Sequence, residues 1–130
     1  MLKTLPHIAI IDDDSSVRQS LQRLIKSLGY DATTFGTADA FLRSLHDIDA
    51  NCILLDIQMP GLSGLDLQSI VTALRSPIPI IFITAHRDED ARSRALALGA
   101  IGFLEKPFDD QALVALLQKA LQTASESENS

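Results

Sequence analysis

The chain has 130 residues, of which 46% are hydrophobic, and its 17 acidic and 11 basic side chains leave a net charge of −6. A chain of this length and composition forms one domain that buries about two-thirds of its unfolded surface, which excludes a disordered protein. The acidic balance argues against nucleic-acid binding through this domain, and no apolar run approaches the roughly 20 residues that a membrane span needs.

Short apolar runs and amphipathic segments alternate along the first half of the chain. His7 to Ile11 is an apolar run that predicts a strand. Apolar residues with the spacing of one helix face then predict a helix over Ser15 to Leu28, with Gly29 as its stop. Asp31 to Phe35 alternates and carries two threonines, as an edge strand does, and Thr37 to Leu45 is predicted to be a short second helix.

The second half of the chain continues the alternation. Three further strands are predicted over Cys52 to Leu55, Ile78 to Ile83 and Ile101 to Leu104. Three further helices are predicted over Leu65 to Leu74, over Asp90 to Leu98, and from a cap at Asp109 to about Leu121. Five strands that alternate with five helices predict an α/β domain with helices on both faces of a parallel sheet.

The last residues differ in composition from the rest. We predict one domain over residues 1-122, followed at 123-130 by TASESENS, which is polar, serine-rich and without apolar periodicity. This segment is interpreted as a flexible tail or as the start of an interdomain linker.

The cysteine content and the N-terminus bear on location. Cys52 is the only cysteine, so an intramolecular disulfide is impossible and a reducing compartment is indicated. Because Cys52 begins an apolar run, we expect a small buried thiol. The chain lacks the charged start and long apolar stretch of a signal peptide. We therefore expect a soluble, cytoplasmic protein with no membrane partner.

Four apolar runs end in polar groups. These groups are Asp12 and Asp13 after IAII, Asp56 after CILL, Thr84 after IIFI and Lys106 after IGFLE. The carboxyl ends of parallel strands share one edge of the sheet, and ligands bind in the crevice outside that edge. We therefore predict that three carboxylates, a hydroxyl and an ammonium converge on one small site.

The acidic cluster indicates a cation site. Close carboxylates repel by about 4 kcal/mol per pair at an effective dielectric constant near 20, so the cluster either takes up protons or binds a cation. Mg²⁺ suits it because this small ion prefers oxygen ligands, whereas zinc prefers His and Cys. The alternative is that Asp12 to Asp14 only cap the first helix and favour its dipole, a role that Asp14 or Ser15 could fill. That alternative does not account for Asp56, which ends a different strand.

The remaining groups indicate phosphoryl chemistry. A carboxylate beside bound Mg²⁺, here Asp56, can act as a nucleophile on phosphorus. Lys106 would then supply a cation and Thr84 a hydroxyl donor for the charged oxygens of the transferred group. Taken singly, Lys106 could be a solvated charge and Thr84 an ordinary strand residue. His86, two residues past Thr84, is interpreted as peripheral.

At this point the motifs match a known family. IIDDD, LLDIQMPGLSG, FITAH and FLEKPF occur in this order, and over about residues 6 to 121 the chain resembles the receiver domain of two-component response regulators. It is most similar to the FixJ-type branch, whose members often control transcription. The resemblance implies a flavodoxin-like fold, a doubly wound parallel sheet of five strand-helix units with strand order 2-1-3-4-5.

The resemblance also implies a role for each site residue. Asp56 would be the phosphoryl acceptor. Mg²⁺ would be held by Asp12, Asp13, Asp56 and the main-chain carbonyl of Gln58. Thr84 and Lys106 would contact the phosphoryl oxygens, and the Lys106-Pro107 peptide would be cis. Phe103 would be an aromatic switch that turns inward as Thr84 moves, although an ordinary core phenylalanine is the alternative.

The implied partner is a sensor histidine kinase that donates the phosphoryl group, with slow self-hydrolysis afterwards. The added charge would switch the face formed by the fourth helix, fifth strand and fifth helix. Asp90 to Leu98 and Ile101 to Phe103 are therefore candidates for a phosphorylation-dependent homodimer interface. The domain would make no direct nucleic-acid contact, and transcription would be controlled by an output domain outside this chain.

Two alternatives use the same residues differently. A phosphatase of the haloacid dehalogenase type also combines an aspartate nucleophile with Mg²⁺, but its nucleophile comes first in the chain, whereas here the acidic pair does. A docking module with a receiver fold would undergo no Mg²⁺-dependent modification of Asp56.

Overall fold

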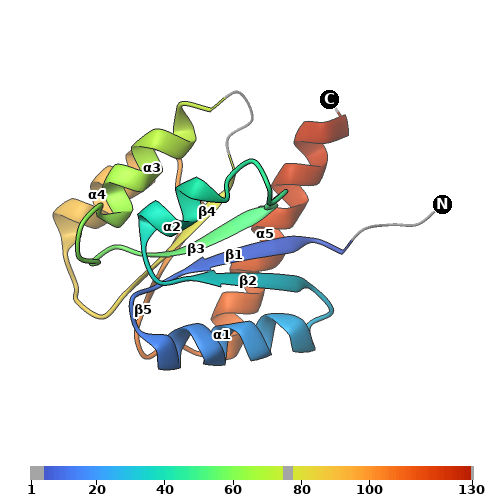
Figure 1. The fold of residues 1–130 in the computed structure, drawn as a ribbon, viewed down its shortest axis with the longest axis horizontal. Coiled ribbons are helices and arrows are strands. Elements are labelled where there is room, and N and C mark those ends of the chain that lie inside the picture. The colour runs from blue at the N-terminus through green and yellow to red at the C-terminus, as the bar shows by residue number, and fades with distance from the viewer. Residues whose placement is uncertain (1–4, 75–77, 130) are drawn as a thin grey trace.

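The computed structural model describes residues 5–74 and 78–129 and forms a five-stranded parallel sheet (Figure 1). The order across the sheet is β2-β1-β3-β4-β5, which confirms the predicted order 2-1-3-4-5. The strands are β1 (His7–Ile11), β2 (Asp31–Phe35), β3 (Cys52–Asp56), β4 (Ile80–Thr84) and β5 (Gly102–Glu105). Because β1 lies beside both β2 and β3, the chain reverses its winding direction at β1, which opens a crevice at the carboxyl ends of β1 and β3.

Five helices connect and follow the strands. They are α1 (Ser15–Ser27), α2 (Ala38–Arg43), α3 (Gly64–Thr72), α4 (Glu89–Ala97) and α5 (Asp110–Asn129). Helices α1 and α5 cover one face of the sheet, and α2, α3 and α4 cover the other (Figure 1). In the part of the chain that the structure describes, no helix has both the length and the apolar character to cross a membrane.

Most predicted bounds agree with the structure to within two residues. Strand β4 begins at Ile80 rather than Ile78, because Pro79 has no N–H to donate to a ladder. Helix α5 continues past the predicted end near Leu121 to Asn129. Apolar periodicity marks where a helix packs, whereas alanine and glutamate favour a helix without packing. Whether residues 123–130 act as a tail or a linker stays a prediction, and Ser130 lies outside the described residues.

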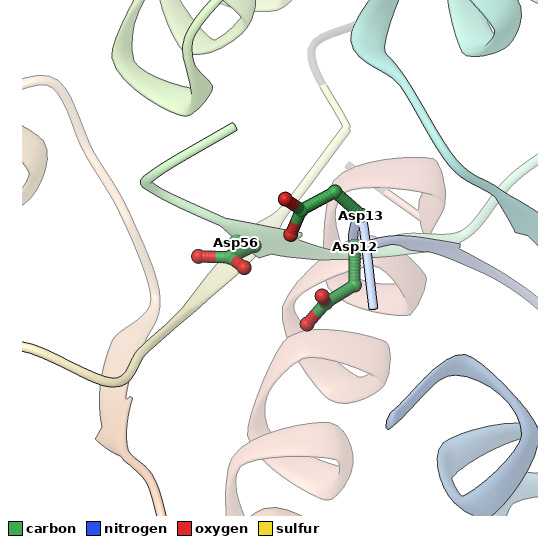
Figure 2. Close-up of side chains that lie close together, drawn as sticks. All are labelled: Asp12, Asp13 and Asp56. Atoms are coloured by element: carbon green, nitrogen blue, oxygen red, sulfur yellow. The ribbon is translucent and has the colours of Figure 1, made fainter. Parts of the chain in front are cut away.

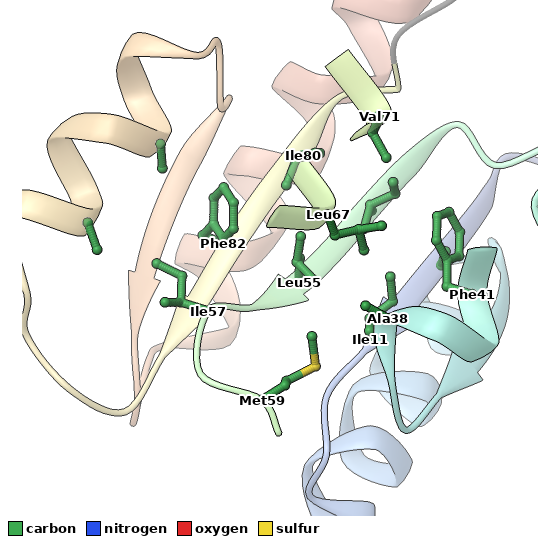
Figure 3. Packing of buried hydrophobic residues seen from close by; sticks show 14 residues of the cluster. Ile11, Ala38, Phe41, Leu55, Ile57, Met59, Leu67, Val71, Ile80 and Phe82 are labelled. Atoms are coloured by element: carbon green, nitrogen blue, oxygen red, sulfur yellow. The ribbon is translucent and has the colours of Figure 1, made fainter. Parts of the chain in front are cut away.

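The sheet is buried on both faces, and its side chains alternate between two cores. Ile8 and Ile10 pack toward α1 and α5, while Ala9 and Ile11 pack toward α2, α3 and α4. Figure 3 shows the second of these cores, in which Phe82, Leu55 and Phe41 lie between the sheet and its covering helices. This two-sided burial explains why the strands appear in the sequence as continuous apolar runs.

Cys52 is fully buried in the core beneath α1 and α5, as expected. Burial raises the pKa of its thiol to about 12, against a smaller opposing effect of a hydrogen bond to the backbone of Ile53. A thiol with so high a pKa is protonated at neutral pH, so Cys52 acts as a small apolar side chain.

Candidate functional site

Three carboxylates gather at the carboxyl edge of the sheet (Figure 2). Asp12 and Asp13 follow β1, and Asp56 is the last residue of β3. Ile11 pairs with Leu55 in the ladder, so the residues that follow each strand arrive side by side. One carboxylate oxygen from each aspartate lies within 4.8 Å of the other two. Asp12 and Asp56 are buried and Asp13 is exposed, so the cluster opens to solvent on one side.

The aspartates in the turn after β1 have different roles. The side chain of Asp14 caps α1 by accepting hydrogen bonds from the N–H groups of Ser16 and Val17. Asp12 accepts a bond from the Asp14 N–H, and its own N–H donates to the carbonyl of Phe35 at 3.1 Å. Since Asp14 performs the capping, the alternative that Asp12 and Asp13 serve only as helix caps is not supported.

Lys106 reaches this cluster from β5. Its Nζ atom lies 2.8 Å from Asp12 Oδ2 and 3.5 Å from Asp56 Oδ2. The Lys106 N–H donates to the carbonyl of Thr84 at 2.7 Å, and the Lys106-Pro107 peptide bond is cis, as expected. Burial alone lowers the pKa of Lys106, but the hydrogen bond and charge of Asp12, with the charge of Asp56, raise it above its ordinary value. Lys106 is therefore a permanent cation.

The pKa of the Asp56 carboxyl group is higher than that of an ordinary aspartate. Its Oδ1 accepts a hydrogen bond from the N–H of Gln58 at 3.1 Å. Burial is the main effect and raises its pKa to about 6; the charges of Asp12 and Asp13 add to it, while the Gln58 hydrogen bond and Lys106 oppose it. The site therefore holds excess negative charge, which a cation would relieve.

Thr84 is the last residue of β4, and Phe103 lies on the neighbouring strand β5. The buried Thr84 hydroxyl donates to the carbonyl of His86 at 2.9 Å and accepts from the His86 N–H at 3.1 Å. The half-buried Phe103 ring lies 5.7 Å from the ring of Phe82, measured between centroids. A cavity of about 220 Å³ includes both Thr84 and Phe103 in its lining, together with Arg87.

The structure thus brings Asp12, Asp13, Asp56 and Lys106 together, with Thr84 at the border. Gln58 meets the site through its N–H, and Phe103 lies on the neighbouring strand β5, opposite Phe82 in the ladder. The oxygen-rich donor set fits Mg²⁺, because carboxylates at this spacing suit a small hard cation and the excess negative charge favours one.

Two further residues, Arg18 and Gly64, support the site, and no sequence motif indicates their roles. Arg18, on α1, donates from Nη1 to the carbonyl of Asp12 at 2.7 Å. A Cβ atom on Gly64 would lie 2.5 Å from the carbonyl oxygen of Asp56, so only glycine fits there. Arg18 looks like any helical surface charge in the sequence, and Gly64 looks like a turn residue. Both roles depend on how the loops after β1 and β3 fold back on the strand ends.

Comparison with known proteins places these features in one family. The family model described as "Response regulator receiver domain" matches residues 8–118. The transcriptional regulatory protein FixJ of Bradyrhizobium diazoefficiens is 42% identical over 95% of this chain and 60% of its own length. Nodulation protein W of the same organism is 44% identical over 82% of this chain and 47% of its own length.

The fold agrees with that of a solved structure. The response regulator StyR superposes with a TM-score of 0.89 and 42% identity, over 97% of this chain and 64% of that one. The chain thus spans between about half and two-thirds of the relatives it matches.

Proposed function

The chain belongs to the response regulator receiver domain family, and from this premise we propose that Asp56 accepts a phosphoryl group from a sensor histidine kinase. The observation that carries the proposal is the position of Asp56. Its carboxylate ends a central strand, lies within reach of two other carboxylates, and has the Lys106 ammonium 3.5 Å away. Asp12 has the same neighbours, but it is 1% exposed and lies 2.8 Å from the Lys106 ammonium, so it is more enclosed and more tightly paired than Asp56, which is 6% exposed.

In the proposed reaction an oxygen of the Asp56 carboxylate attacks phosphorus. The P–N bond of the donor phosphohistidine breaks, and the imidazole nitrogen keeps the bonding electron pair. With a pKa of about 6, Asp56 is mostly ionised at neutral pH and is available as the nucleophile. The product is an aspartyl phosphate, which water later hydrolyses.

The acidic cluster would hold the cation that the reaction needs. We assign its ligands as Asp12, Asp13, Asp56 and the main-chain carbonyl of Gln58. Bound Mg²⁺ would neutralise charge on the phosphoryl oxygens and on the carboxylates. Lys106 now neutralises Asp12 at 2.8 Å, and in the modified protein its ammonium would turn to a phosphoryl oxygen.

Movements of Thr84 and Phe103 would transmit the effect of phosphorylation to the surface of the domain. The Thr84 hydroxyl would leave the His86 carbonyl and donate to a phosphoryl oxygen. Phe103 would turn inward as Thr84 moves, since both residues line the same cavity. The affected face comprises α4, β5 and α5, and it would control a phosphorylation-dependent homodimer. Regulation of transcription, by analogy with FixJ, would belong to a domain outside this chain.

Two measurements test this function. Phosphoramidate, a small donor with a P–N bond, should modify the protein once in the presence of Mg²⁺, whereas a generic phosphate ester should not be turned over. Continuous ester hydrolysis would favour a phosphatase, and absence of any modification would favour a docking module. Sedimentation before and after modification tests the dimer, and an unchanged profile would contradict it.

A further inference from the structure

A buried glutamine links two helices that otherwise have little holding them together. Gln68, in the middle of α3, is 1% exposed, and its Nε2 donates to the main-chain carbonyl of Ala95 in α4 at 2.8 Å. Among the buried side-chain atoms that the structure describes, Oε1 of Gln68 is the one without a hydrogen-bond partner. A buried amide satisfied on one side only contributes little to folding, because the unpaired oxygen offsets the bond that the nitrogen makes.

Helix α4 is weakly anchored apart from this contact. Its buried side chains are Ala91 and Ala95, and the rest of its residues are exposed. Alanine buries less apolar surface than any other core side chain except glycine, so α4 contributes a small packing interface. One hydrogen bond to its last turn is therefore a large part of what holds its position.

The surroundings of this contact leave room for movement. The Ala95 carbonyl also accepts from the N–H of Ala100 at 3.0 Å, so it stays satisfied if Gln68 withdraws. A cavity of about 370 Å³ lies at the amino ends of β4 and β5, lined by Gln68, Thr72 and the connection from Leu98 to Ile101. The carboxyl end of α4 can shift at this cavity without stranding the Ala95 carbonyl.

We propose that Gln68 is a latch that positions α4 in the unmodified protein, and that its hydrogen bond to Ala95 breaks when Asp56 is phosphorylated. The inference rests on the proposed function, since it names the contact that phosphorylation must overcome. The half-satisfied amide makes the latch weak, which a switch between two states requires. Gln68 touches none of the groups proposed to react, so it is a positioning residue.

Removal of the latch should release α4 without harming the fold. Gln68→Met keeps an unbranched side chain of similar length and removes both the donor and the unpaired acceptor, so the free energy of unfolding should be unchanged or higher. By reciprocity, a contact that opposes the modified conformation also weakens ligands of that conformation. Beryllofluoride, a phosphoryl mimic, should bind the variant with Mg²⁺ about 2- to 10-fold more tightly, as expected for one hydrogen bond.

The test compares Gln68→Met with Gln22→Met in hydrogen exchange and beryllofluoride titration. Gln22 is a matched control, because its amide also donates to a main-chain carbonyl, that of Ala32, but on the opposite face of the sheet. We expect Gln68→Met alone to speed exchange of the N–H groups of Leu98, Gly99 and Ala100 before any modification. We expect the same variant alone to bind beryllofluoride more tightly.

The outcomes separate the latch from the function on which it rests. Unchanged exchange at the end of α4 would overturn the latch, whatever the titration shows. Faster exchange with unchanged beryllofluoride affinity would overturn its coupling to Asp56. If wild-type protein bound no beryllofluoride, the proposed function and the regulatory role of Gln68 would both fail, although the exchange data would still report the contact itself.

Discussion

The ammonium of Lys106 lies 2.8 Å from Asp12 Oδ2, although the two residues are 94 positions apart in the chain. Asp12 is 1% exposed, so this pair neutralises a carboxylate that has almost no access to water. A second distance, 3.5 Å from Lys106 Nζ to Asp56 Oδ2, shows that one ammonium lies close to two carboxylates. In the unmodified site the Lys106 ammonium thus neutralises Asp12 and Asp56, and in the proposed reaction it turns to the phosphoryl group.

The loss of this cation should destabilise the protein in a way that Mg²⁺ reverses. In Lys106→Met the buried Asp12 carboxylate loses its partner, and we expect the free energy of unfolding to fall by about 1–3 kcal/mol in EDTA, the range for a buried acceptor left unsatisfied. Mg²⁺ should restore most of the loss, because the ion takes over the neutralisation. Urea unfolding with and without Mg²⁺ measures both effects. Lys26→Met, at an exposed position in the last turn of α1, is the control and should change little.

The raised pKa of Asp56 predicts a pH dependence of stability. Its pKa is about 6 in the folded protein and near its ordinary value of 3.8 in the unfolded chain, so the folded state holds the proton more tightly. The resulting stabilisation is present below pH 3.8 and is lost as the pH rises through 6. At pH 7 in EDTA, Asp56→Asn should therefore be more stable than wild type by about 1 kcal/mol, a figure reduced for screening by nearby water.

The difference between Asp56→Asn and wild type is the quantity to follow, because carboxylates remote from the cluster titrate equally in both proteins. It should shrink as the pH falls from 7 toward 4. A difference that stays constant over this range, measured by urea unfolding, would contradict the raised pKa.

Gly64 should be irreplaceable for steric reasons. A Cβ atom there would lie 2.5 Å from the carbonyl oxygen of Asp56 and 2.9 Å from Cα of Ile57. Gly64→Ala should lower the free energy of unfolding by about 1–3 kcal/mol and weaken Mg²⁺ binding, since the strand end that carries Asp56 must shift. Gly61→Ala is the control: that position has φ of +80° but open space around it, so stability should fall while Mg²⁺ affinity holds.

Substitutions of Asp13 and Asp14 should affect different properties, Mg²⁺ binding for Asp13 and helix capping for Asp14. Asp13→Asn removes an exposed carboxylate of the cluster, so Mg²⁺ affinity should fall about tenfold or more while stability in EDTA stays the same or rises. Asp14→Asn still caps the helix, whereas Asp14→Ala should lose about 1 kcal/mol of stability and keep its Mg²⁺ affinity. Calorimetric titration with Mg²⁺ and urea unfolding distinguish the two patterns, and equal effects of Asp13→Asn and Asp14→Ala would contradict the division of roles.

Much of the fold follows from local patterns in the sequence. Two-sided burial of β3 and β4 appears as continuous apolar runs, and the alternation of strands and helices leads to the parallel sheet. Parallel strands alone place Asp12 and Asp56 at the same edge of the sheet. The strand order came from the family resemblance, since periodicity does not specify which strands are neighbours.

The remaining features leave no mark in the apolar pattern of the sequence. The sequence allows Asp14 or Ser15 as the cap of the first helix, and the choice of Asp14 depends on the direction of the turn after β1. Burial of Gln68 against α4 contradicts the usual exposure of glutamine, so composition alone would place it on the surface. The continuation of α5 to Asn129 falls in a segment without apolar periodicity, so a search for that periodicity overlooks it.

The most direct test of the central claim is the intact mass of the protein after incubation with acetyl phosphate and Mg²⁺. Wild-type protein should gain one phosphoryl group, and the gain should be absent in EDTA and absent in Asp56→Asn. A phosphoryl group retained by Asp56→Asn, a gain independent of Mg²⁺, or an unmodified wild type would contradict the assignment of Asp56 as the acceptor.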